Sequence, residues 1–135
     1  KQILPDNTLD FGFSATAMHW LSAKPCDISH HVHMVGAQGE EYLRFSEHGK
    51  KDWESILLHR ALELKKGGQL VLLNFCRDET GKYLGNTTGV NMFTNFADIW
   101  QDFLDQGRIR PEEYRNMTLP QYYNTVEEFS APLKN

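Results

Sequence analysis

Apolar residues recur at helical spacing in two long segments of the chain. In residues 52–66 they share one face of the predicted helix: Trp53, Ile56, Leu57, Ala61 and Leu64. In residues 91–106 they form a wider face: Phe93, Phe96, Ala97, Trp100, Phe103 and Leu104. Asp52 can cap the first helix by accepting hydrogen bonds from the unpaired amides of its first turn, and Gly67 and Gly68 can end it. The pattern predicts two long amphipathic helices.

Two apolar runs are typical of strands. The run at residues 9–13 is short, whereas residues 69–75 are almost continuously apolar, which predicts a strand buried on both faces of a parallel sheet. A short helix is expected directly after the first strand, over residues 15–21. The following polar connection, residues 22–49, is predicted to hold a short strand or turn at residues 42–45. A helix, a glycine pair and a buried strand in succession predict an αβ unit.

The second half of the chain contains signals for short helices. Pro111 suits the first position of a helix, and Leu119-Pro120 should end that helix. Thr125 and Glu128 have the spacing of a capping box for a further helix. We therefore predict an α/β fold in which residues 1–77 supply two strands of the sheet. Residues 78–135 should form a helical cap that returns toward the core at its C-terminal end.

The composition and charge argue against some classes of binding partner. The 135 residues are 40% hydrophobic and carry a formal net charge of −4, which argues against nucleic acid because its phosphates need clustered Lys and Arg. The doublets Lys50-Lys51 and Lys65-Lys66 are predicted to be solvated helix ends. No apolar run approaches the roughly 20 residues of a membrane span. Two cysteines, Cys26 and Cys76, are expected to be reduced thiols, so we expect a cytoplasmic protein.

An imidazole and an indole follow the first predicted strand. In open α/β sheets, ligands bind at the carboxyl ends of the strands, where His19 and Trp20 lie. Thr16, one turn earlier on the expected short helix, should line the same pocket. The sequence therefore places a ligand site in residues 14–22.

Two other sets of polar side chains, three histidines and two aspartates, have possible functional roles that we do not favour. His30, His31 and His33 lack the Cys or carboxylate partners of a convincing metal set, so a solvated loop and no metal are expected. Asp98 and Asp102 lie at i, i+4 on a helix and could in principle act as paired carboxylates. Their expected place is the solvated face opposite the aromatic residues.

Four stretches resemble one enzyme family, in matching order along nearly the whole chain. They are Leu4-Pro5-Asp6-Asn7-Thr8-Leu9 with residues 14–22, Arg60-Ala61-Leu62-Glu63-Leu64 with Gly67-Gly68, residues 103–109 with Gly107, and Leu119-Pro120-Gln121-Tyr122-Tyr123 with Val126-Glu127-Glu128. Together they resemble the plant-type carboxyl methyltransferases that act on salicylate, benzoate, jasmonate and xanthine-type substrates, the SABATH family. Thr16 replaces an aromatic residue of the family motif, and Phe75-Cys76-Arg77 replaces Leu-Gly-Arg, which leaves the substrate open.

The resemblance implies a Rossmann-like methyltransferase sheet, of which this chain holds the later strands, with a helical cap. It implies an enzyme that uses S-adenosylmethionine to methylate the carboxylate of a small organic acid, often as a homodimer, with no metal and no acid–base catalytic residue. The indole N–H of Trp20 would bind the carboxylate, and His19 and Thr16 would set specificity. The resemblance implies four further pocket residues: Phe75, Met92, Phe93 and Tyr122. Ser14 would lie beside the cofactor.

The cofactor-binding half of such an enzyme is missing from the sequence. The family's Asp-x-Gly-x-x-x-Gly loop is absent, and Gly36-Ala37-Gln38-Gly39 follows no buried strand, so we expect a fragment of a longer enzyme. Three alternatives stay open: methylation of a ring nitrogen, an inactive fragment or homologue that acts as a binding or dimerisation module, and a nucleotide-linked oxidoreductase on a similar sheet. The absent Gly-x-Gly-x-x-Gly fingerprint counts against the oxidoreductase as much as the absent cofactor loop counts against the methyltransferase. The order of the four motifs is what disfavours the oxidoreductase.

Overall fold

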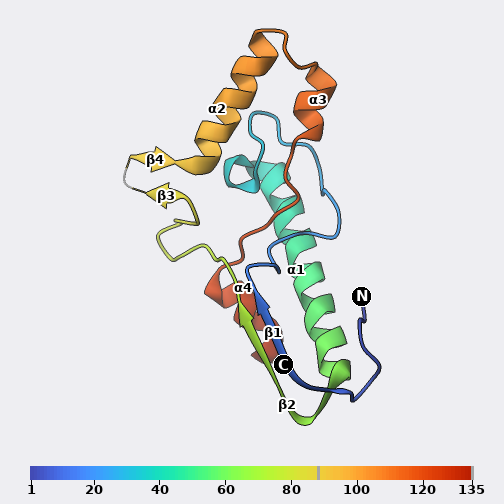
Figure 1. The fold of residues 1–135 in the computed structure, drawn as a ribbon. Coiled ribbons are helices and arrows are strands. Elements are labelled where there is room, and N and C mark those ends of the chain that lie inside the picture. Colours follow the sequence, from blue (N-terminus) through green and yellow to red (C-terminus); the bar gives the residue numbers. More distant parts are fainter. Residues whose placement is uncertain (88, 135) are drawn as a thin grey trace.

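One long helix connects two parallel strands and forms the frame of the molecule (Figure 1). The computed structural model describes residues 1–87 and 89–134. Its first half contains β1 (Leu9–Ala15), η1 (Met34–Gly36), α1 (Gly39–Glu63) and β2 (Leu64–Leu73). Its second half contains β3 (Asn86–Thr87), β4 (Val90–Asn91), α2 (Met92–Asp105), α3 (Pro111–Asn116), α4 (Val126–Ser130) and η2 (Ala131–Lys134).

The strands β1 and β2 pair in parallel, with Phe13 beside Val71 and Ser14 beside Leu72. The predicted αβ unit is therefore confirmed. The prediction that the second strand is buried on both faces is wrong, because Val71 is 41% and Leu73 is 51% exposed. Burial alternates along β2, since within the described residues α1 and α4 cover one face of the sheet while the other face stays open.

The helix α1 begins 13 residues earlier than the sequence predicts, at Gly39 instead of Asp52. Residues 42–45, expected to form a strand or turn, lie inside it, and Asp52 accepts hydrogen bonds from the N–H and hydroxyl of Ser22 (2.7 and 2.8 Å) instead of capping a helix. The buried positions are Phe45, Gly49, Trp53 and, at the last residue of the helix, Glu63. Gly49 interrupts the apolar pattern because a Cβ there would lie 2.6 Å from the Tyr122 ring.

The boundary between α1 and β2 also differs from the prediction. The helix ends at Glu63, and Lys65, Lys66 and Gly67 already belong to the strand. Gly67 adopts φ +84°, where the register between the strands shifts. Lys65 is paired with Asp10 across the strands (2.7 Å), so this doublet does not lie at a solvated helix end.

The short helix expected over residues 15–21 does not form. Ala15 is the last residue of β1, Thr16 has φ +54°, and the Trp20 N–H closes a turn onto the Ala17 carbonyl (3.2 Å). Residues 19–21 instead pair with residues 120–122, far along the chain, through the Tyr122 N–H donating to the His19 carbonyl (2.9 Å). Long-range pairing has overridden the local helical preference.

The helices of the second half follow their sequence signals. Asn91 caps α2 by accepting hydrogen bonds from the N–H groups of Phe93 and Thr94, and Pro111 opens α3. The capping box of Thr125 opens α4, as predicted. The end of α3 differs from the prediction, because the helix stops at Asn116, ahead of Leu119-Pro120.

Candidate active site

Residues 119–125, here called the strap, run from α3 toward α4 past the carboxyl ends of both strands (Figure 1). The Leu21 N–H donates to the Pro120 carbonyl (2.8 Å), and the Arg77 N–H donates to the Asn124 carbonyl (3.0 Å). The strap therefore joins the segment after β1 to the segment after β2. It places its side chains where ligands bind in sheets of this class.

Side chains on an extended segment alternate between its two sides. Gln121 and Tyr123 point to the side of His33, whereas Tyr122 points to the side of α1. The Tyr122 hydroxyl donates to Glu128 Oε1 (2.8 Å) and lies 3.3 Å from the Tyr42 hydroxyl. Burial raises the pKa of Tyr122, so this network holds a neutral phenol in the core.

Six rings converge on the other side of the strap and form the aromatic cluster: His19, His33, Phe75, Tyr83, Phe93 and Tyr123. Tyr123 lies at its centre, with ring centroids 5.5 Å from His19, 6.2 Å from Phe75 and 6.1 Å from Phe93. Trp20 stands at the outer edge, 5.8 Å from His19 and 50% exposed. The cluster gathers residues from the end of each strand, from α2 and from the strap.

His33 is fully buried, contrary to the expected solvated loop. Its ring stacks on Phe93 at 3.8 Å and 9°. Its Nε2 lies 3.0 Å from Gln121 Oε1, and its Nδ1 accepts a hydrogen bond from the Val35 N–H (3.4 Å). Only the neutral tautomer that carries its proton on Nε2 satisfies both partners. His33 thus joins α2 to the strap as an uncharged link.

Burial lowers the pKa of His33 to about 4. The unfolded chain binds this proton near pH 6.5, so the contribution of neutral His33 is fully present above that pH and is lost as the pH falls toward 4. The loss amounts to about 3 kcal/mol of unfolding free energy. We expect urea unfolding between pH 7.5 and 4.5 to show a steeper pH dependence in the wild type than in His33→Gln.

The matched control for this prediction is His30→Gln, because His30 is exposed in the same loop. It should keep the wild-type pH dependence. Equal pH dependence in wild type and His33→Gln would show that the buried imidazole does not limit stability in acid.

His19 and Trp20 give the site its polar groups. His19 is 5% exposed, and its buried Nδ1 has no hydrogen-bond partner among the described residues. Burial lowers the pKa of His19, so the ring is neutral at pH 7 and can donate one N–H. A buried ring nitrogen without a partner costs about 1–3 kcal/mol, which a ligand could recover. Next to it, the exposed Trp20 indole carries a second N–H donor.

The structure gathers some of the predicted site residues and separates others. His19, Phe75 and Phe93 belong to the aromatic cluster, with Trp20 at its edge. The other four lie apart from the cluster. Thr16 is exposed, and Ser14 lies beside Leu72 on the face of the sheet that α1 covers. Met92 packs against Gly85, and Tyr122 lies on the far side of the strap.

Sequence reasoning missed four residues of the site: His33, Tyr83, Gln121 and Tyr123. The signal that was available is the pair Tyr122-Tyr123 in the strap, since an extended segment sends neighbouring residues to opposite sides. Which tyrosine faces which side depends on the pairing with His19 and Leu21, and the local sequence does not carry that information.

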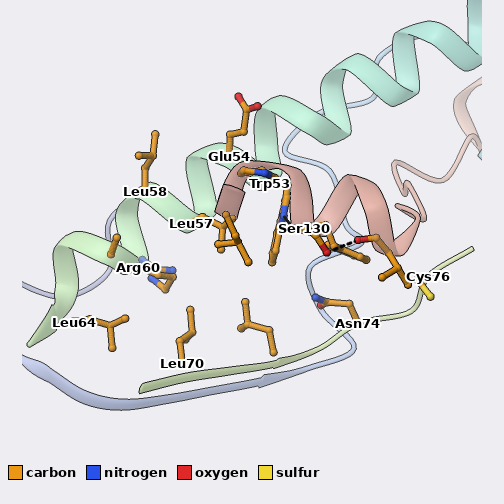
Figure 2. A pocket seen from close by; sticks show the side chains of 16 residues that line it. Trp53, Glu54, Leu57, Leu58, Arg60, Leu64, Leu70, Asn74, Cys76 and Ser130 are labelled. Atoms are coloured by element: carbon orange, nitrogen blue, oxygen red, sulfur yellow. Dashed lines mark hydrogen bonds between the residues drawn. The ribbon is translucent and has the colours of Figure 1, made fainter. Parts of the chain in front are cut away.

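An apolar-lined groove lies elsewhere, between α1, β2 and α4 (Figure 2). It has a volume of about 920 Å³, and Leu57 and Leu70 point into it from opposite sides. Its lining is mainly apolar and includes none of the predicted site residues. Its polar lining residues include Arg60, Asn74 and Ser130, and it shares no residue with the aromatic cluster.

None of the helices in the described part of the chain is both long and apolar enough to cross a bilayer. Residues 1–87 and 89–134 contain no group of three His, Cys, Asp or Glu side chains that could hold a metal ion. Cys26 and Cys76 are both free, as predicted.

Comparison with known proteins identifies the relatives of this chain. A family model described as "SAM dependent carboxyl methyltransferase" matches residues 1–135. Indole-3-acetate O-methyltransferase 1 of Arabidopsis thaliana is 25% identical over 138 residues, covering 96% of this chain and 36% of that protein. Farnesoic acid carboxyl-O-methyltransferase of the same plant is 30% identical over 150 residues, covering 99% of this chain and 40% of that protein.

A solved structure of loganic acid methyltransferase with SAH superposes with a TM-score of 0.84 at 21% identity, covering 99% of this chain and 40% of that one. This likeness confirms the predicted fold class, part of a Rossmann-like methyltransferase sheet with a helical cap. The chain spans about two fifths of the length of the relatives that it matches.

Proposed function

The chain belongs to the SAM-dependent carboxyl methyltransferase family, and from that premise we propose that the complete polypeptide methylates the carboxylate of a small organic acid. The SABATH resemblance is thereby confirmed. The observation that carries the proposal is the pairing of an exposed indole, Trp20, with a buried imidazole, His19, at the carboxyl end of β1. The aromatic cluster behind them supplies an apolar wall for the rest of the acid.

The residues at this end of the sheet fit a cationic methyl donor. Ser14, Ala15 and Thr16 are small, and the faces of aromatic rings attract cations. Because His19 is neutral at pH 7, it does not repel a positive sulfonium. When bound, S-adenosylmethionine would supply a methyl carbon on positively charged sulfur. An ionised carboxylate oxygen can bond to this carbon as the carbon–sulfur bond breaks and a neutral thioether leaves, so no acid–base catalyst is needed. Ser14 is the residue that we place beside S-adenosylmethionine.

Trp20 and His19 orient the acid. The Trp20 N–H donates to one carboxylate oxygen and leaves the other free to attack the methyl carbon. A hydrogen bond to a charged acceptor is worth about 1.5–3 kcal/mol. His19 donates its N–H to an oxygen of the substrate, and Phe75 and Phe93 exclude water from the acid. Holding the reacting atoms about 3 Å apart supplies much of the rate enhancement.

We include the rest of the predicted organisation in this proposal. Residues 1–77 are the core portion and residues 78–135 the cap, since the strap and α4 return to the strands and to α1. Thr16 and Met92 line the pocket in the complete polypeptide, whereas Tyr122 anchors the strap from its far side. The free cysteines support a cytoplasmic protein, and the net charge of −4 supports a partner other than nucleic acid. Exposed Phe96 and Ile99 on α2 support a homodimer.

The test is titration calorimetry of S-adenosylmethionine into the complete polypeptide, followed by turnover with a panel of small carboxylic acids. We expect binding and the formation of a methyl ester from at least one acid. Absence of binding to the complete polypeptide would favour the alternative, a module without enzymatic activity.

A further inference from the structure

We propose that Tyr123 sets the depth of the acid-binding pocket and thereby the size of the acid that is accepted. This inference rests on the proposed function and adds to it a specificity-determining residue. It arises from the path of decreasing exposure that leads inward from Trp20 (50%) through His19 (5%) to Tyr123 (2%). The ring centroids along this path are 5.8 and 5.5 Å apart.

Tyr123 occupies the space into which the body of a bound acid would extend. With the carboxylate on Trp20 and His19 beside it, the apolar end of the acid points toward the aromatic cluster. There the Tyr123 ring lies between Phe75 from the end of β2 and Phe93 from α2. The Tyr83 ring packs near Tyr123 as well, with a centroid distance of 6.4 Å. The Tyr123 side chain is therefore the floor of the pocket.

The pairing of the strap fixes this floor in place. The Tyr122 N–H donates to the His19 carbonyl, so the next residue, Tyr123, is directed to the side where Gln121 meets His33. Tyr122 cannot exchange roles with it, because a slip by one residue would bring Tyr123 into the packed core beside Phe45 and Gly49. Burial raises the pKa of Tyr123, so its phenol stays neutral and does not repel a carboxylate.

Removing the phenol ring should lengthen the pocket. Cavities lined by apolar residues stay dry and accept small apolar rings. A longer acid would place its second ring where the Tyr123 ring now lies, between Phe75 and Phe93. Tyr123→Phe keeps the ring and removes only the hydroxyl, so it is the matched control.

The experiment compares kcat/KM for benzoic acid and biphenyl-4-carboxylic acid in the complete polypeptide. We expect Tyr123→Ala to raise the ratio of biphenyl-4-carboxylic to benzoic acid by at least about 10-fold, the scale of discrimination that pocket shape provides. Tyr123→Phe should keep the ratio within about 3-fold. If thermal unfolding shows that Tyr123→Ala does not fold, Tyr123→Leu, which leaves a smaller space, takes its place and should shift the ratio in the same direction.

The two possible failures are distinguishable. An unchanged ratio in a folded, active Tyr123→Ala or Tyr123→Leu variant overturns the inference and leaves the proposed function intact. If the wild type forms no methyl ester from any acid of the panel, the proposed function fails, and the inference fails with it.

Discussion

Replacing Trp20 with phenylalanine in the complete polypeptide is expected to lower kcat/KM for carboxyl methylation by about 10- to 100-fold. The substitution keeps an aromatic ring at the edge of the cluster and removes the N–H that we propose binds the carboxylate. The expected loss is about 1.5–3 kcal/mol, the worth of a hydrogen bond to a charged acceptor, and each 1.4 kcal/mol is tenfold in rate. Steady-state kinetics with the preferred acid measure the loss. Calorimetry should show that affinity for S-adenosylmethionine stays within a few-fold of wild type.

The matched control is Trp100→Phe on α2. Its Nε1 is buried without a partner among the described residues, so removing that N–H breaks no hydrogen bond of the site. Kinetic constants of this variant should stay close to wild type. Equal activity of Trp20→Phe and Trp100→Phe would refute the role that we assign to the Trp20 indole.

Replacing Phe45 with alanine destabilises the fold by about 3–5 kcal/mol, the usual cost of deleting a buried phenyl ring. Phe45 is fully buried and packs in one cluster with Ile28, Met34 and Tyr122, where α1 meets the loop before it and the strap. The cavity would also loosen the strap that carries Tyr123. Urea unfolding, monitored by circular dichroism, gives the change in unfolding free energy.

Leu43→Ala provides the control, because Leu43 lies two residues earlier on α1 and is exposed. It should change stability by less than about 0.5 kcal/mol. Comparable losses for the two variants would contradict an α1 helix that buries Phe45 and exposes Leu43.

The parts of the fold that the sequence predicts are those that local chemistry determines. Asn91 and Thr125 accept hydrogen bonds from amides two or three residues ahead, and Pro111 has the backbone geometry of a first helical turn. All three helix starts are where the pattern places them. The apolar run in β2 likewise identifies a strand. Capping, proline geometry and apolar runs depend on neighbouring residues alone, which is why these predictions succeed.

The errors occur where distant segments decide the outcome. A glycine at position 49 interrupts the apolar periodicity of residues 39–51, because a side chain there would clash with the Tyr122 ring. The first half of α1 is therefore not predicted from the sequence. The helix expected after β1 is replaced by pairing between His19 and Tyr122. Neither the sequence around Gly49 nor the sequence around His19 indicates that Tyr122 is the partner.

In the candidate site too, residues in local patterns could be predicted, whereas residues positioned by distant segments could not. His19 and Trp20 could be predicted, because a strand end followed by polar aromatic residues is a local feature. Burial of His33 depends on Gln121 and Phe93, which are brought to it by the strap and by α2. The choice of Tyr123 over Tyr122 depends on a one-residue register that only the folded chain determines.

The most direct test of the central claim is the chemical nature of the methylated product. The complete polypeptide is incubated with methyl-labelled S-adenosylmethionine and its preferred acid, and the product is treated with mild alkali. A carboxyl methyl ester releases its label as methanol, and the yield should fall in the Trp20→Phe variant. Label that withstands alkali, as on a methylated ring nitrogen, or no labelled product at all, would contradict the account.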